Sequence, residues 1–339
     1  MIRVLIVEDS TTVRRLLRHI LESDPEIEVV GEAADGAEAV RMAESLRPDL
    51  ITMDIHMPRV DGLEATKQIM VRVPTPIVIV STSTKGGEVS RSFDAIQAGA
   101  VALLDKPVDP AADGFDTLAR ELVDTVRSLA DMKVVRRWGP ALEARVTVPE
   151  KGQGWLVGIA ASTGGPAALS VVLGDLPPGL SAPVLVVQHI AAGFTEGLAS
   201  WLAGRCPLPV TIAQSGAKAE PGVVYIAGDD AHLGIDGKGR IALCGSDPVG
   251  GHRPSANHLF RSMADAWAGA TLAVVLTGMG SDGLEGLRVL KKKGGTILVQ
   301  NKETSVVYGM NREVERAGLA DAALPLDRIA DRIAKVVEA

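Results

Sequence analysis

Residues 49–54 read Asp-Leu-Ile-Thr-Met-Asp, a short apolar run that ends in an acid, and the rest of the first half repeats this design. Further apolar runs lie at 2–7, 27–31, 76–80 and 101–104, with helical patterns at 11–22, at 36–46 and near 115–130. Strands that alternate with helices predict an α/β domain built on a five-stranded parallel sheet with right-handed crossovers.

Charged and polar side chains stand where these strands would end. Glu8 and Asp9 follow the first run, Asp54 follows the third, Ser81 follows the fourth and Lys106 follows the fifth. The carboxyl ends of parallel strands meet at one edge of a sheet, so these side chains are expected to lie together. A single residue of this kind usually caps a loop, but five at corresponding strand ends favour a site.

This set resembles the receiver domain of two-component response regulators, over residues 1 to about 125. The resemblance implies a flavodoxin-like fold that is phosphorylated on Asp54, with Mg²⁺ as the cofactor of that step. Oxygen ligands suit this ion, and we expect them from Asp9, Asp54 and the backbone carbonyl of His56, with Glu8 holding a water on the metal. A phosphatase with an Asp-x-Asp strand end fits less well, because the second acid is missing after Asp9.

The switch residues of the receiver follow from the same resemblance. Lys106 would pair with the phosphorylated aspartate, and Ser81 would hydrogen-bond it. Pro107 after the lysine fits a cis peptide bond that aims the lysine side chain. Leu103 stands where receivers usually carry an aromatic switch residue.

The composition limits the classes of protein to consider. The 339 residues suffice for two domains, and 46% hydrophobic with 23% charged residues is typical of globular proteins. A net charge of −7 argues against a nucleic-acid partner. The cysteines, Cys206 and Cys244, have no metal-ligand or disulfide spacing. Neither a signal peptide nor a spanning segment is visible, so we expect a cytoplasmic protein without membrane insertion.

A second α/β unit begins near residue 154. Its apolar runs lie at 156–160, 184–187, 223–226, 272–276 and 296–299, and predict another doubly wound, Rossmann-like sheet. Between the units, residues 131–153 carry several charges, prolines and a glycine without a clear amphipathic pattern, which indicates a linker. The predicted organisation is therefore a first domain at 1–125, a helix end and linker at 126–153, and a second domain at 154–339.

Ser162 is the candidate nucleophile of the second unit. It lies in Ala-Ala-Ser-Thr-Gly-Gly-Pro, residues 160–166, between the first strand and a helix. Backbone N–H groups at such a turn favour developing negative charge. A phosphate-binding loop is the alternative, but the turn has neither Gly-Lys-Ser/Thr nor Gly-x-Gly-x-x-Gly.

A base and an acid follow the neighbouring strands. His189 ends the strand at 184–187, and Asp282 lies in a glycine-rich loop just beyond the strand at 272–276. Such an acid often only caps the helix that follows, here expected at 283–293. The other histidines of this half, His232, His252 and His258, compete with His189 for the role of base, and His252 is interpreted as a residue of a loop that lines the site.

These motifs are similar to those of the CheB family of chemotaxis receptor protein-glutamate methylesterases/glutamine deamidases. The match rests on residues 158–166, 187–189, 194–195, 252–255, 276–283 and 304–310. It implies Ser162 as nucleophile, His189 as general base and Asp282 as its orienting acid. It also suggests Thr163 as a site neighbour and the backbone N–H of Met279 as an oxyanion donor.

The resemblance implies a phosphorylation-activated serine hydrolase of a chemotaxis two-component system. It would demethylate glutamate methyl esters and deamidate glutamines on chemoreceptors, with a histidine kinase as phosphoryl donor and without a cofactor for ester hydrolysis. Two alternatives belong to other classes. A DNA-binding response regulator would need a basic recognition helix, which the second half lacks, and a catalytically silent adaptor would keep the fold and lose turnover.

Overall fold

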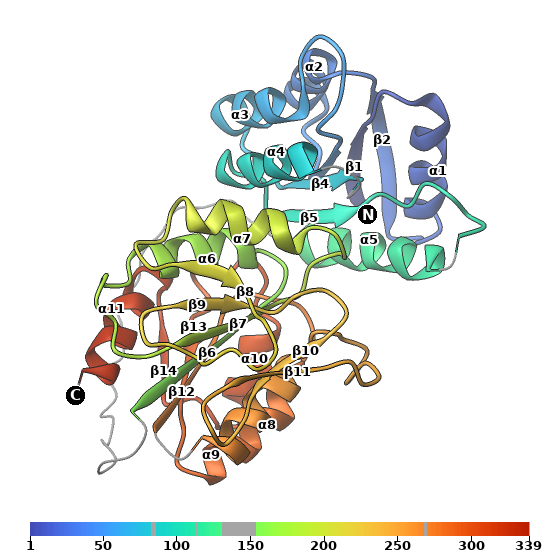
Figure 1. Cartoon of the computed structure of the whole chain (residues 1–339). Coiled ribbons are helices and arrows are strands. Elements are labelled where there is room, and N and C mark those ends of the chain that lie inside the picture. Colours follow the sequence, from blue (N-terminus) through green and yellow to red (C-terminus); the bar gives the residue numbers. More distant parts are fainter. Residues whose placement is uncertain (83–85, 113, 131–153, 268–269, 339) are drawn as a thin grey trace. The chain divides into compact units, whose positions relative to one another are not determined.

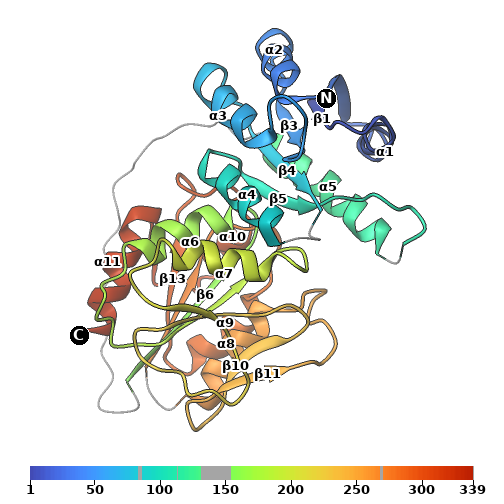
Figure 2. The same cartoon turned by 45° about the horizontal axis from the view of Figure 1, so that its top comes forward.

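The computed structural model describes residues 1–338 except 83–85, 113, 131–153 and 268–269. For residues 86–91 it describes the backbone and not the side chains. The chain forms two compact units, Met1–Arg136 and Arg137–Ala339, which Figures 1 and 2 show from two directions. The predicted linker at 131–153 lies outside the described residues.

The first unit is the predicted parallel sheet with five strands in the order β2-β1-β3-β4-β5. The strands are β1 (Ile2–Val7), β2 (Ile27–Ala33), β3 (Leu50–Met53), β4 (Ile77–Ser81) and β5 (Ala102–Asp105). The helices are α1 (Thr11–Leu21), α2 (Gly36–Leu46), α3 (Gly62–Arg72), α4 (Gly86–Gln97) and α5 (Phe115–Ala130). Every residue of β3 is buried, as expected for a central strand whose two faces are both covered.

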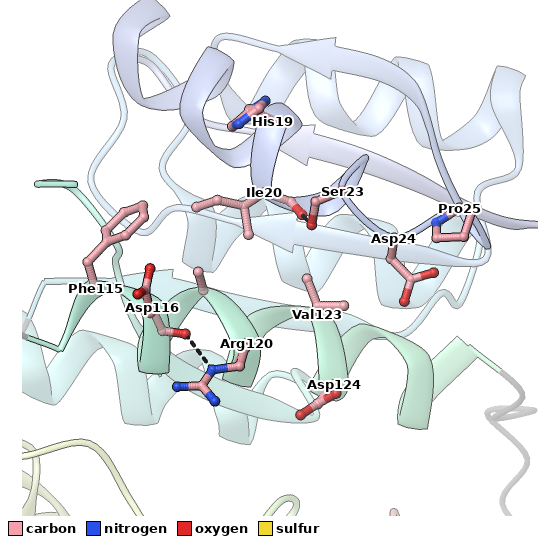
Figure 3. A pocket seen from close by; sticks show the side chains of 11 residues that line it. His19, Ile20, Ser23, Asp24, Pro25, Phe115, Asp116, Arg120, Val123 and Asp124 are labelled. Carbon is pink, nitrogen blue, oxygen red and sulfur yellow. Dashed lines mark hydrogen bonds between the residues drawn. The ribbon is translucent and has the colours of Figure 1, made fainter.

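Helices α1 and α5 contact each other along the sheet, and a groove of about 750 Å³ lies over them. Figure 3 shows its lining, with Arg120 Nε donating to the backbone carbonyl of Asp116 at 3.0 Å. None of the predicted site residues lines this groove.

The second unit is a parallel sheet with the order β14-β13-β12-β6-β7-β9-β8, and a separate hairpin β10-β11. The strands are β6 (Trp155–Ala161), β7 (Val184–Gln188), β8 (Val210–Ile212), β9 (Val224–Ile226), β10 (His232–Ile235), β11 (Ile241–Cys244), β12 (Ala270–Val275), β13 (Thr296–Gln300) and β14 (Ala322–Leu324). The helices are α6 (Gly165–Gly174), α7 (Thr195–Ala203), α8 (Ala256–Ala266), α9 (Leu284–Lys292), α10 (Met310–Arg316) and α11 (Leu326–Val337).

The order of this sheet reverses at its middle strand. The chain goes from β6 to β7 on one side, and later returns to place β12 on the other side of β6. A doubly wound sheet forms its site at such a switch point, outside the carboxyl ends of the strands. The loops that follow β6, β7 and β12 therefore meet at one edge.

The predicted elements agree with the structure to within about two residues, but four short strands, β8, β10, β11 and β14, were not predicted. The expectation of a cis peptide bond between Lys106 and Pro107 is wrong. Among the described residues, the cis peptide bond joins Arg253 and Pro254. No helix in the described part of the chain is both long and apolar enough to cross a bilayer.

Candidate active site

Ser162 follows β6 directly, in a turn that the glycines after it make possible. Gly164 has φ of +78°, and a Cβ there would lie 2.5 Å from Cβ of Val306, so no other residue fits. The backbone N–H of Ser162 donates to the carbonyl of Thr277 at 3.1 Å, which ties the turn to the loop after β12. Ser162 is half-buried, at the edge where the sheet order reverses.

The structure brings His189 and Asp282 together, although 93 positions separate them in the sequence. Nε2 of His189 lies 2.9 Å from Oδ2 of Asp282, and both side chains are largely shielded from solvent. Residue 189 follows β7 and residue 282 lies beyond β12, the two strands that flank β6. The expected meeting of these residues at one edge of the sheet is therefore what the structure shows.

Asp282 caps a helix, but not the one that the sequence suggested. Its Oδ1 accepts from the hydroxyl of Ser255 at 2.8 Å and from the N–H of Asn257 at 3.1 Å, and its Oδ2 accepts from the N–H of Ala256 at 2.6 Å. These groups open α8, whereas α9, the helix that follows Asp282, begins after Gly283 without a side-chain cap. One carboxylate thus holds both the histidine and the first turn of α8.

The electrostatics of Asp282 fix it as a carboxylate. Burial alone would raise its pKa, but the hydrogen bond and charge of His189 and the donors of Ala256 and Ser255 outweigh burial and lower the pKa to about 2. A permanent anion next to Nε2 keeps the proton on that ring nitrogen.

The second ring nitrogen of His189, Nδ1, is then the one without a proton. Nδ1 is buried and has no hydrogen-bond partner among the described residues. Since Nε2 donates to Asp282, Nδ1 carries a free lone pair. This assignment of the two nitrogens is the reverse of the one in chymotrypsin-type triads.

The three competing histidines make contacts that differ from those of His189. His252 stacks face to face on His189, with ring centroids 4.1 Å apart and planes within 1° of parallel. Burial and the neighbouring His189 lower the pKa of His252. His232 is fully buried, and its Nδ1 accepts from the N–H of Ser255 at 3.2 Å, while His258 stacks on His232.

The proposed oxyanion loop lies against Ser162. A Cβ on Gly278 would come within 2.8 Å of Cβ of Ser162, so this glycine allows the close approach. The carbonyl of Gly278 accepts from the N–H groups of Gly309 and Met310 at 3.1 and 2.9 Å, and this pair fixes the peptide unit that leads into Met279. The hydroxyl of Thr277 donates to the carbonyl of Thr163 at 3.0 Å.

The receiver unit gathers its predicted residues at the carboxyl edge of its sheet. Nζ of Lys106 lies 2.8 Å from Oε2 of Glu8 and 3.0 Å from Oδ2 of Asp54. Carboxylate oxygens of Glu8, Asp9 and Asp54 lie within 4.8 Å of one another. Ser81 ends the strand beside β5, and its carbonyl accepts from the N–H of Lys106 at 3.0 Å. The N–H of His56 lies 3.4 Å from Oδ1 of Asp54.

This donor set fits a magnesium ion. Three carboxylates face a single lysine, so the cluster keeps a surplus of negative charge on hard oxygen atoms, which is the chemistry that Mg²⁺ selects. Burial is the main cause that raises the pKa of Glu8. The nearby charge of Asp54 also raises this pKa, whereas Lys106 lowers it without reversing the shift. Burial lowers the pKa of Lys106, but the negative charges of Asp54 and Glu8 outweigh burial, so the pKa of Lys106 is raised.

Four polar residues of the second site had no assigned role in the sequence analysis. They support the site residues through backbone and side-chain hydrogen bonds and are Gln188, Ser255, Thr277 and Gln300. A serine directly before α8 was a visible capping signal. The bonds of Gln188 and Gln300 join different strands, and sequence spacing does not reveal such contacts.

Comparison with known proteins identifies both units. The CheB methylesterase family model matches residues 157–333, and the response regulator receiver domain model matches residues 4–112. Protein-glutamate methylesterase/protein-glutamine glutaminase 4 of Myxococcus xanthus is 50% identical and aligns with 98% of this chain and 96% of its own length. The corresponding protein 3 of Anaeromyxobacter dehalogenans is 51% identical, with 98% of both chains covered.

A solved structure agrees with this result. The catalytic domain of the Thermotoga maritima CheB methylesterase is 39% identical, with a TM-score of 0.53, and it covers 55% of this chain and 100% of its own. The two units thus define a response regulator whose output unit is an esterase. Within that class, the chain belongs to the CheB family of protein-glutamate methylesterases/protein-glutamine glutaminases.

Proposed function

We propose that this protein hydrolyses glutamate γ-methyl esters on the cytoplasmic helices of chemoreceptors under the control of its own receiver domain. The observation that carries the proposal is the hydrogen bond between His189 and Asp282, at the edge of the second sheet where Ser162 follows β6 and the strand order reverses. Family membership supplies the substrate class. A nucleophile, a base and an orienting acid are the groups that acyl transfer requires.

Hydrolysis proceeds through a covalent acyl-enzyme. The hydroxyl of Ser162 attacks the ester carbonyl while Nδ1 of His189 takes its proton, and Asp282 stabilises the resulting imidazolium. The tetrahedral oxyanion accepts a hydrogen bond from the backbone N–H of Met279, next to the nucleophile. His189 returns the proton to the leaving methanol, and a water molecule then releases the glutamate by the same steps in reverse.

Deamidation of receptor glutamines uses the same groups. The leaving atom is nitrogen instead of oxygen, so His189 must protonate it before the tetrahedral intermediate collapses to ammonia and the acyl-enzyme. The names of the relatives include glutaminase, which supports this second activity.

The receiver controls the esterase through phosphorylation of Asp54 by a chemotaxis histidine kinase. Glu8, Asp9, Asp54 and the carbonyl of His56 would hold Mg²⁺, which offsets negative charge on the incoming phosphoryl group. The carboxylate of Asp54 attacks the phosphorus atom as the bond from phosphorus to the phosphorylated histidine of the kinase breaks, and the kinase histidine leaves. Lys106 and Ser81 then bind the oxygens of the phosphorylated Asp54 side chain.

The proposed boundaries are a receiver at 1–125, a helix end and linker at 126–153, and an esterase at 154–339. Helix α5 ends at Ala130, and the family models match 4–112 and 157–333, which supports this division. The cysteine thiols Cys206 and Cys244 are free, which supports action in the reducing cytoplasm.

Release of methanol from methylated receptor membranes tests the proposal. Ser162→Ala should lower the rate by about 10⁴- to 10⁶-fold, since it removes the nucleophile. Ser170→Ala is the matched control, because this serine lies on α6, eight residues beyond the nucleophile, and should leave the rate unchanged. Near-normal methanol release by Ser162→Ala would remove this residue as nucleophile, and the absence of turnover in the wild-type protein would favour the silent adaptor.

A further inference from the structure

Gln188 joins the backbones of the proposed nucleophile and base. It is the last residue of β7, and its side chain is buried, with 4% of the residue exposed. Its Nε2 donates to the carbonyl of Ser162 at 2.9 Å and to the carbonyl of His189 at 2.7 Å. A single amide group therefore uses both of its N–H bonds on the two residues whose relative position decides proton transfer.

The surrounding backbone leaves this amide one orientation. The carbonyl of Ser162 also accepts from the N–H of Gly165 at 2.7 Å, and the N–H of His189 donates to the carbonyl of Ala161 at 2.9 Å. A flipped amide would place its oxygen against two carbonyl oxygens, with no donor to satisfy it. The oxygen Oε1 is instead buried and has no hydrogen-bond partner among the described residues.

Gly165 provides the space for that oxygen. A Cβ at this position would lie 1.9 Å from Oε1 and 2.8 Å from Cδ of Gln188. The φ of Gly165 does not fall in the left-handed range, so backbone strain does not explain the glycine. The oxygen Oε1 gains no hydrogen bond from its position, and the absence of a side chain at residue 165 only makes room for it. The two hydrogen bonds of Nε2 are therefore the reason for this arrangement.

We propose that Gln188 is a positioning residue of the esterase, which sets the distance and angle between Ser162 and Nδ1 of His189. The inference rests on the proposed function, because it assigns the reaction to these two groups. A misplacement of about 1 Å between reacting groups can cost on the order of 100-fold in rate. Such an effect changes kcat and leaves substrate binding unaltered.

Two substitutions of Gln188 test the proposal in the full chain, with methylated receptor membranes as substrate. Gln188→Met keeps the volume and removes both donors, and Gln188→Glu keeps the shape and places a carboxyl group against two carbonyl oxygens. We expect kcat to fall about 10- to 100-fold in both variants. KM should stay within about twofold of the wild type, since no group that binds substrate has changed.

Trp267→Phe is the control for loss of a hydrogen bond from a side chain to the backbone beside β6. Nε1 of Trp267 donates to the carbonyl of Gly154 at 3.1 Å, just before β6, at the edge of the sheet opposite Ser162. This variant loses one hydrogen bond from a side chain to the backbone at the start of β6, the strand that Ser162 follows. Its kcat should equal that of the wild type. The thermal midpoint of each variant, followed by circular dichroism, separates lost stability from lost positioning.

A double-mutant cycle with Gly165→Ala gives an independent measurement. The new methyl group would displace the amide of Gln188, so we expect a similar fall in kcat in the wild-type background and a clearly smaller one in the Gln188→Ala background. The contact of that methyl group with Cβ of Ala161 occurs in both backgrounds and cancels in the cycle.

Three results would overturn the assignment: wild-type kcat in Gln188→Met, a change confined to KM, or strict additivity in the cycle. These failures differ from failure of the proposed function. If Ser162→Ala stays active, the nucleophile is wrong, whereas an inactive Ser162→Ala beside a fully active Gln188→Met removes only the positioning role.

Discussion

Replacement of Asp282 by asparagine tests the electrostatic design of the second site. The carboxylate accepts five hydrogen bonds, from His189, Ser255, Ala256, Asn257 and Gly283. An amide cannot accept at both of its atoms, so its NH₂ group must face some of these donors. With NH₂ toward His189, Nε2 would have to accept, the ring proton would move to Nδ1, and the base would be lost.

The expected losses follow from these contacts. The pKa of Asp282 falls from 3.8 to about 2, which corresponds to about 2 kcal/mol of native-state stabilisation of the carboxylate at neutral pH. Asp282→Asn should therefore lower the free energy of unfolding by about 2 kcal/mol. It should lower kcat about 10³- to 10⁴-fold, less than His189→Ala, because the base is misoriented and not removed.

The pH dependence has a definite sign. Because the folded-state pKa of Asp282 is below its ordinary value, the stabilisation is complete above about pH 4 and is lost as the pH falls through about 2. Acid unfolding of wild type and Asp282→Asn should therefore converge in that window.

Tryptophan fluorescence in urea measures this stability, since the sequence of the first unit contains no tryptophan, whereas Trp155, Trp201 and Trp267 lie in the second. Asp321→Asn is the control. Asp321 accepts from the N–H of Ile297 at 2.8 Å and pairs with Lys291 near the start of β13, so its replacement should cost stability and leave kcat unchanged. A kcat of Asp282→Asn within tenfold of the wild type, or an equal loss in Asp321→Asn, would refute the reasoning.

Two further predictions concern regulation and the stacked histidine. We expect the unphosphorylated receiver to restrain the esterase, so a truncated protein of residues 154–339 should show higher basal methanol release than the intact chain. A small-molecule phosphoryl donor with Mg²⁺ should activate the intact chain, and Asp54→Asn should block this; equal rates in all cases would contradict the inhibitory role. His252→Ala should lower kcat about tenfold through loss of the stacked ring. His252→Phe should recover most of it, and equal rates for the two variants would show that the stacking is irrelevant.

The apolar runs alone determined most of the fold. Central strands of a parallel sheet are covered on both faces, so β1, β3, β6 and β7 appear as predominantly apolar segments that can be recognised in the sequence. The strands that were missed have three or four residues each and lie at the two edges of the second sheet or in the separate hairpin, away from the central positions that produce apolar runs. The site residues were visible because each stands directly after such a run or within a glycine-rich loop beyond it.

Contacts between distant segments were decided only by the tertiary structure. The sequence suggested that Asp282 caps the helix that follows it, but the packing of α8 beside the site gives the carboxylate to Ala256 and Asn257 instead. The choice of Nε2 for Asp282, which leaves Nδ1 as the proposed base, depends on the rotation of one ring. The double hydrogen bond of Gln188 depends on the register of β6 against β7. Local sequence sets which residues end a strand, whereas the partners of a polar group are set by burial, which requires the whole sheet to be assembled.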